Sequence, residues 1–147
     1  MAVDSATLDV NSPYAYLLWC RDFAATSVIA EVDGEPAGFV TGYRRPAQPQ
    51  TLMVWQVAVN AAHRGAGLAG RMLDHLAAAH VPQGVTHLET SITPDNDASR
   101  RLFGAFARRW DAQLECSELF GAGLFSESHL AEDLFRIGPL GVNPRRR

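Results

Sequence analysis

A glycine-rich turn between an apolar run and a helical pattern constrains the fold of this chain most strongly. Residues 63–70 read HRGAGLAG; they follow the apolar run LMVWQVAV (52–59) and open the pattern LAGRMLDHLAAAH (68–80). Glycine costs roughly 1 kcal/mol relative to alanine wherever a helix could use alanine. The glycines therefore need a backbone reason, and the order of strand, turn and helix predicts one βα unit of a sheet protein.

The start of such a helix can bind an anion. Its first N–H groups lack partners within the helix, and the helix dipole adds roughly half a positive charge there. The alternative is a tight turn that serves packing alone. The turn lacks the Gly-Lys-Ser/Thr ending of a P-loop and the full Gly-x-Gly-x-x-Gly pattern with a following acidic residue, so neither ATP nor NAD is indicated.

Composition indicates one folded domain over residues 1–147, with residues 139–147 as a flexible tail. The 147 residues are 47% hydrophobic and 20% charged, an ordinary globular mixture. The net charge of -3 argues against a nucleic-acid partner. The chain start has no signal-peptide pattern, and no apolar stretch reaches the ~18 residues of a membrane span. We expect a cytoplasmic protein without a membrane partner.

Two cysteines carry no predicted chemistry. Cys20 lies in a helical pattern and Cys116 in a strand-like one, and their spacing is not that of metal ligands. We expect two buried thiols rather than a disulfide, and no metal site.

The first half of the chain predicts a helix, a hairpin and a central strand. Ser12 and Pro13 form an N-cap and first-turn pair for a helix that reaches about Phe23. Two strand-like runs in 27–44 flank Asp33-Gly34, a strong hairpin signal. The run 52–60 is apolar on both faces, which is typical of a central strand.

The second half predicts another βα unit and two last strands. Residues 85–93 read as a strand, and a turn at 94–97 caps a helix that carries Phe103. Residues 114–120 and 134–140 supply the last strands. The predicted fold is therefore α/β, a mixed sheet with helices on both faces.

The glycine turn resembles the pyrophosphate loop of GCN5-related N-acetyltransferases (GNAT), whose pattern is Q/R-x-x-G-x-G/A. Residues 64–69 match this pattern completely, after a valine-rich strand and before an amphipathic helix. The resemblance implies a GNAT-type, mostly antiparallel twisted sheet and acetyl-CoA as cosubstrate. The cofactor contacts it implies are Val57, Val59, Arg64, Gly65, Ala66, Gly67, Leu68, Ala69, Asn96 and Ser99.

Longer strings resemble the family of L-2,4-diaminobutyrate acetyltransferases of ectoine synthesis. They are LDVNSPYAYLLWCRDF (8–23), GFVTGYRRP (38–46), VWQVAV (54–59) and FARR (106–109). The resemblance implies acetyl transfer from acetyl-CoA to the 4-amino group of L-2,4-diaminobutyrate, with direct attack by the amine. It also implies a homodimer.

A diamino acid presents two ammonium groups and one carboxylate, so its pocket should contain carboxylates and aromatic faces. The resemblance places Asp9, Tyr14 and Trp55 at this amine site. Two structural alternatives stay open: Asp9 as a helix cap or solvated acid, and Trp55 as core packing.

Two residues are candidates for the general base. Glu89 is a charge in the middle of an apolar strand, where it needs a partner. His129 lies in the final loop, either as a base or simply exposed. Arg44 and Arg45 either bind the substrate carboxylate or end a solvated hairpin.

The chain departs from the GNAT pattern in two places. Phe103 stands where many members have a tyrosine that protonates the leaving thiolate, and phenylalanine has no proton to give. The usual first strand and helix are missing before the segment that starts at Thr7. Two alternative functions therefore stay open: acetylation of another small amine, and a coenzyme A-binding module without catalysis.

Overall fold

The computed structural model describes residues 11–125 and 129–141, which form one six-stranded sheet in the order β1-β2-β3-β4-β6-β5. The helices are α1 (Pro13–Asp22), α2 (Leu68–His80) and α3 (Asp97–Arg109). The strands are β1 (Val28–Val32), β2 (Glu35–Arg45), β3 (Gln48–Val59), β4 (His87–Ile92), β5 (Gln113–Phe120) and β6 (Glu132–Gly138). Only the β3–β4 pair is parallel, and the other four pairs are antiparallel.

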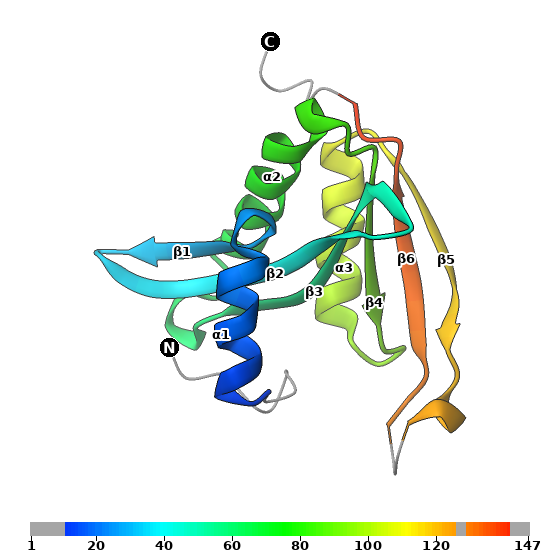
Figure 1. The fold of residues 1–147 in the computed structure, drawn as a ribbon, viewed down its shortest axis with the longest axis horizontal. Coiled ribbons are helices and arrows are strands. Elements are labelled where there is room, and N and C mark those ends of the chain that lie inside the picture. The colour runs from blue at the N-terminus through cyan, green and yellow to red at the C-terminus, as the bar shows by residue number, and fades with distance from the viewer. Residues whose placement is uncertain (1–10, 126–128, 142–147) are drawn as a thin grey trace.

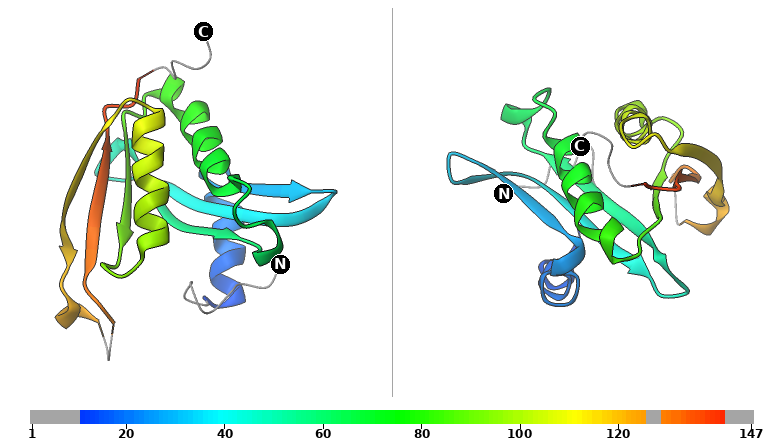
Figure 2. Two further views of the ribbon diagram at one scale, coloured as in Figure 1. Left: turned by 180° about the vertical axis from the view of Figure 1, so that it is seen from behind. Right: turned by 90° about the horizontal axis from the view of Figure 1, so that it is seen from above.

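Helices cover both faces of the sheet, as the sequence predicts. α1 packs on one face, and α2 and α3 lie together on the other (Figures 1 and 2). The buried core fills the space between the sheet and the α2–α3 layer, and its largest fully buried apolar side chains are Phe103, Phe106, Leu52, Leu73, Leu88 and Ile137. α1 contributes no buried residue, so it is attached differently from the other two helices.

Local sequence signals produce the elements where they were expected. Ser12 caps α1, since its Oγ accepts a hydrogen bond from the Ala15 N–H at 3.2 Å. Asp33 and Gly34 have φ values of 52° and 80°, the conformation that a two-residue hairpin turn requires. α2 spans the same residues as the predicted helix.

Three expectations need correction. Both cysteines are free but exposed, because each lies on a surface face of its element. Leu140 is buried in the core, and its N–H donates to the Thr86 carbonyl at 2.7 Å, so the predicted tail does not include this residue. The third strand starts at Gln48, four residues earlier than predicted, because β2 and β3 form a second hairpin.

Across residues 11–125 and 129–141, no helix has the length and apolar character needed to cross a membrane.

Candidate active site

β3 and β4 separate part-way along their length. Their parallel register covers only Thr51–Val54 of β3, paired with His87–Thr90 of β4. β3 continues to Val59, where it still pairs with Gly38 of β2. The C-terminal half of β3 therefore has a partner strand on one side only, and Figure 1 shows the two strands diverging.

A β-bulge at Trp55 determines which backbone groups face this split. Gly42 pairs with Val54 and Thr41 with Gln56, which leaves Trp55 as the extra residue. Before the bulge the even-numbered residues face β4, since the Gln50 carbonyl accepts from the Thr86 N–H at 2.8 Å.

Beyond the bulge this alternation is reversed. The Asn60 N–H donates to the Ala37 carbonyl at 2.7 Å, so even-numbered residues now face β2. The backbone groups of Val57 and Val59 consequently face the split. The Val59 carbonyl already accepts a hydrogen bond from Arg64 Nε at 3.3 Å.

The two central glycines of the turn are required by backbone conformation. Gly65 and Gly67 have φ values of 80° and 75°, a left-handed region that other residues enter at a cost of about 1–2 kcal/mol. A Cβ at either position would meet nothing within 4 Å, so local crowding is not the reason for glycine.

Gly67 is also the N-cap of α2. No side chain caps this helix, in contrast to Ser12 on α1 and Asn96 on α3. The first N–H groups of α2, including those of Leu68 and Ala69, are therefore presented without a side-chain acceptor. A bare helix start beside an open strand edge is suited to an anionic ligand.

Asn96 and Ser99 lie at the start of α3, which follows β4. Asn96 Oδ1 accepts a hydrogen bond from the Ser99 N–H at 3.1 Å, so its carbonyl oxygen serves as the helix cap. Phe103 is 2% exposed and belongs to the core.

Comparisons to known proteins show the family of this chain. The family model of the acetyltransferase (GNAT) family matches residues 4–107. This chain belongs to the GNAT family.

Two relatives that are both named L-2,4-diaminobutyric acid acetyltransferase are similar to nearly the whole of this chain. An L-2,4-diaminobutyric acid acetyltransferase of Streptomyces avermitilis is 58% identical over 143 residues, covering 95% of this chain and 80% of the relative. The corresponding protein of Nocardia farcinica is 54% identical over 145 residues, covering 99% and 75%.

A solved structure is similar in fold and sequence. The diaminobutyrate acetyltransferase EctA of Paenibacillus lautus, in complex with L-2,4-diaminobutyric acid and coenzyme A, has a TM-score of 0.88 and 41% identity, covering 94% of this chain and 84% of that one.

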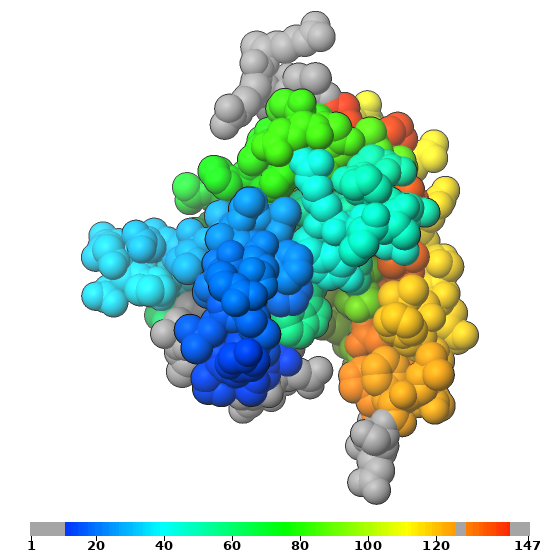
Figure 3. Space-filling view, viewed as in Figure 1, coloured from blue at the N-terminus to red at the C-terminus, as the bar shows by residue number. Residues whose placement is uncertain are grey.

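Two of the three amine-site candidates, Tyr14 and Trp55, lie on the side of the sheet that α1 covers. Trp55 is 39% exposed, and its ring lies 4.7 Å from that of Trp19 on α1, centroid to centroid. Tyr14 is 69% exposed and has no ring contact among the described residues. Asp9 lies outside the described residues. Figure 3 shows a hollow on this face, in the lower half of the view, between α1 (blue) and the β5–β6 pair (yellow and orange).

Glu89 is buried, and both of its carboxylate oxygens are occupied. Oε2 accepts from Arg45 Nη1 at 3.1 Å, and Oε1 accepts from Arg136 Nη1. The side chain of Glu89 is 4% exposed, against 37% for Arg45 and 29% for Arg136. The expected partner of this buried charge is therefore a pair of arginines.

His129 lies near the start of β6, which pairs with the end of β4. Its ring stacks on that of Phe125 at 4.1 Å, and Nδ1 contacts the Leu130 carbonyl at 2.6 Å. Because a carbonyl only accepts, Nδ1 carries the proton, and Nε2 faces Glu132 Oε1 at 3.7 Å. The half-buried ring is thus ordered by its neighbours.

Arg44 lies on the opposite face from Trp55. It pairs with the buried Leu52 across the hairpin, and its guanidinium donates to the carbonyl of Gln83 at 3.3 Å and the side chain at 3.1 Å. A further contact at 3.4 Å joins the Arg44 guanidinium to His80 Nδ1. Arg44 ties β2 to the end of α2, so the structure argues against its binding the substrate carboxylate.

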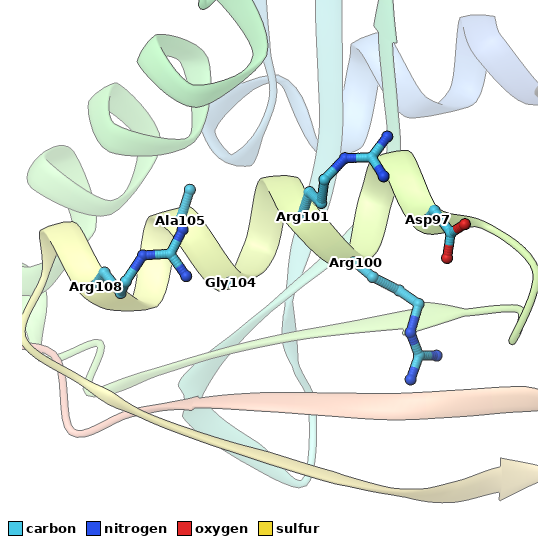
Figure 4. A pocket seen from close by; sticks show the side chains of 6 residues that line it. All are labelled: Asp97, Arg100, Arg101, Gly104, Ala105 and Arg108. Carbon is cyan, nitrogen blue, oxygen red and sulfur yellow. The ribbon is translucent and has the colours of Figure 1, made fainter.

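A separate depression of about 550 Å³ runs along the outer face of α3. It is lined by Asp97, Arg100, Arg101, Gly104, Ala105 and Arg108 (Figure 4), none of which is a predicted site residue. Arg100 extends toward β6, where it pairs with Asp133 at 3.4 Å, and Arg101 leaves the helix on the other side. All six lining residues belong to α3, and none belongs to β3.

Sequence reasoning missed Trp19, whose ring contacts that of Trp55, and Tyr43, whose ring contacts that of Trp19. Trp19 contacts the rings of Phe23, Tyr43 and Trp55. The spacing of Trp19 and Phe23 on one helix face was the available signal. Over the described ranges, no group of three or more His, Cys, Asp or Glu side chains is arranged to hold a metal ion.

Proposed function

We propose that this chain transfers acetyl from acetyl-CoA to the 4-amino group of L-2,4-diaminobutyrate, a step of ectoine synthesis. Its relatives are named for acetyl transfer to this diamino acid. The single structural observation that carries the proposal is the split between β3 and β4, with an uncapped glycine-started helix at its end. The identity of 58% to a diaminobutyric acid acetyltransferase supports the substrate.

The described residues fit acetyl-CoA as cosubstrate. Positive φ at Gly65 and Gly67 exposes backbone toward solvent, and the N–H groups through Ala69 would hold the pyrophosphate. Val57 and Val59 would bind the pantetheine arm through backbone groups that face the split. Arg64 would contact the cofactor at the end of β3, and Asn96 and Ser99 would contact it from the start of α3.

The chain supplies proximity and an oxyanion donor for the transfer. The amine attacks the thioester carbonyl, and the developing oxyanion would receive a hydrogen bond from a β3 backbone N–H in the split. Such a donor contributes about 3 kcal/mol in other acyl-transfer enzymes. Collapse of the tetrahedral intermediate then breaks the C–S bond and releases coenzyme A as its thiolate. Trp55, Tyr14 and Asp9 would bind the diamino acid through its ammonium groups.

We propose His129 rather than Glu89 as the base. Both oxygens of Glu89 already accept hydrogen bonds from guanidinium groups. His129 has its Nδ1 proton donated to a carbonyl, which leaves the Nε2 lone pair for a proton. His129→Gln should lower kcat without changing KM for acetyl-CoA. An unchanged kcat would return the role to another group.

We also propose a single-domain homodimer in the cytoplasm. β1 is an edge strand of the sheet and carries the exposed side chain of Ile29 (65%), which supports an association surface at that edge. Sedimentation velocity over a range of concentrations tests the dimer directly. A single monomer species at all concentrations would contradict it.

The experiment that tests the function measures thiol release from acetyl-CoA. L-2,4-Diaminobutyrate is compared with putrescine and lysine, and NMR reads the position of the acetyl group. Selective acetylation of the 4-amino group is the expected result. Turnover of another amine alone would keep the chemistry and change the substrate, and cofactor binding without turnover would favour a non-catalytic module.

A further inference from the structure

We propose that Trp19 is a positioning residue of the amine site, which orders the Trp55 ring and fixes α1 against the sheet. The inference rests on the proposed function, because the role of Trp55 does. It adds a residue that contacts neither substrate in the proposal and acts through its neighbour.

The Trp19 ring is held on several sides. Its centroid lies 4.7 Å from those of both Trp55 and Phe23, and 6.0 Å from that of Tyr43, which it meets edge to face. Nε1 donates to Ser27 Oγ at 3.1 Å, and that hydroxyl donates in turn to the Phe23 carbonyl at 2.9 Å. The hydrogen bond fixes the rotation of the indole, which the ring contacts alone would leave free.

Trp55 needs such support more than a regular strand residue does. It is the extra residue of the β-bulge, so it has no directly opposite residue on β2 to pack against. Its ring nevertheless packs on Trp19 while 39% of the residue stays exposed. A tryptophan that is supported by one ring and still open to solvent can receive an ammonium group on its surface.

α1 depends on the same contact. No residue of this helix is buried, and Tyr14 and Leu17 are 69% and 68% exposed. Trp19 makes ring contacts with Tyr43 of β2 and Trp55 of β3, and Phe23, the C-cap of the helix, makes a further one with Tyr43 at 6.2 Å. Loss of the Trp19 ring would therefore leave Trp55 without its ring partner and weaken the attachment of the helix that carries Tyr14.

Two substitutions separate the ring contact from the hydrogen bond. Trp19→Phe keeps an aromatic ring without the Ser27 bond, and Trp19→Leu removes the ring. We expect Trp19→Leu to raise KM for L-2,4-diaminobutyrate about 5-fold to 30-fold, the range of one cation–π contact, and Trp19→Phe to recover part of it. KM for acetyl-CoA should change less than about 2-fold in both.

The matched control is Trp110→Phe, a tryptophan on the other face of the sheet. Trp110 is 3% exposed, and its Nε1 donates to Asp74 at 3.0 Å, so the substitution also removes an indole and its hydrogen bond. It should lower the melting temperature without changing either KM. Equal rises in both KM values for Trp19→Leu, or no rise in either, would overturn the inference.

A spectroscopic measurement is independent of turnover. In protein labelled with 5-fluorotryptophan, fluorine NMR should show one sharp Trp55 resonance, because the Trp19 ring packs on the Trp55 ring at 4.7 Å. Trp19→Leu should broaden or split the Trp55 resonance, and Trp110→Phe should leave it sharp. A single sharp Trp55 resonance in Trp19→Leu would overturn the positioning role. Absence of diaminobutyrate turnover in the unmodified protein would instead refute the proposed function, and this signal would still decide whether Trp19 orders Trp55.

Discussion

The glycine loop and the Glu89 cluster differ in how their polar groups are satisfied. At the loop, backbone N–H groups start α2 without a side-chain cap, on glycines at positive φ. At Glu89, a buried carboxylate has one guanidinium on each oxygen. The N–H groups of the loop lack a side-chain acceptor, which a ligand could supply, whereas both carboxylate oxygens of Glu89 already accept hydrogen bonds.

This difference separates two readings that a sequence treats alike. A glycine run and a charge inside a strand both break a local rule and both suggest a site. On the proposed function, the loop with uncapped N–H donors binds the cofactor, and the cluster whose charges match stabilises the fold. Substitutions in the two regions should therefore act on different measurements.

Removal of Glu89 should give the largest loss of stability. Glu89→Ala leaves two guanidinium groups without their carboxylate, and breaking a buried pair costs 3–5 kcal/mol where the remaining charge is buried. Because both arginines are partly exposed, we expect about 3 kcal/mol in urea unfolding. Glu115→Ala, an exposed carboxylate at the same register as Arg136, should cost less than about 0.5 kcal/mol. Equal losses of stability in Glu89→Ala and Glu115→Ala would contradict the special role given to the Glu89 cluster.

Substitution of Gly67 should act on cofactor affinity first. Gly67→Val should raise KM for acetyl-CoA about 10-fold to 100-fold, since a hydrogen bond to a charged group contributes about 1.5–3 kcal/mol. The positive φ adds a stability cost of about 1–2 kcal/mol. Gly84→Val is the control, because Gly84 has a φ of 92° in a turn at the other end of α2. A KM that rises equally in both variants would show a general folding effect.

His87 should make stability fall at acidic pH. Burial, and then the Arg136 guanidinium, lower the pKa of His87, with partial opposition from Glu89 and Glu115. The unfolded chain then binds the proton more tightly, so stability is complete above about pH 6.5 and declines as pH falls below it. Urea midpoints between pH 5 and pH 8 should show a shallower decline for His87→Gln.

The control for this pH series is an exposed histidine. His75 lies on the solvent face of α2, and His75→Gln should leave the decline unchanged. A decline of the same slope in the His87 variant would assign the acid sensitivity to another group.

Substitution of Arg108 should have the smallest effect. This arginine lines the depression on the outer face of α3, which the proposal leaves without a cofactor. Arg108→Ala should change stability by less than about 0.5 kcal/mol and leave KM for acetyl-CoA unchanged. A rise comparable to that of Gly67→Val would move the anion site to α3.

Short-range signals predicted most elements of the fold. Ser12, Asp33-Gly34 and the periodicity of 68–80 each act within a few residues, and the structure has a cap, a turn and a helix at those places. The glycine loop was predictable for the same reason.

Features that depend on register could not be predicted. The bulge at Trp55 and the face that Arg44 occupies follow from the pairing of β2 with β3, which local patterns do not encode. The contact between Trp19 and Trp55 joins residues on separate elements, as does the pairing of Glu89 with Arg45 and Arg136. The burial of Leu140 likewise depends on its docking beside Thr86.

Calorimetric titration of acetyl-CoA into three proteins tests the central claim most directly: the unmodified chain, Gly67→Val and Glu89→Gln. We expect the affinity for acetyl-CoA to weaken about 10-fold or more in Gly67→Val and to stay unchanged in Glu89→Gln, which is compared at a temperature where it is folded. Weakened binding in Glu89→Gln with unaltered binding in Gly67→Val would contradict the central claim.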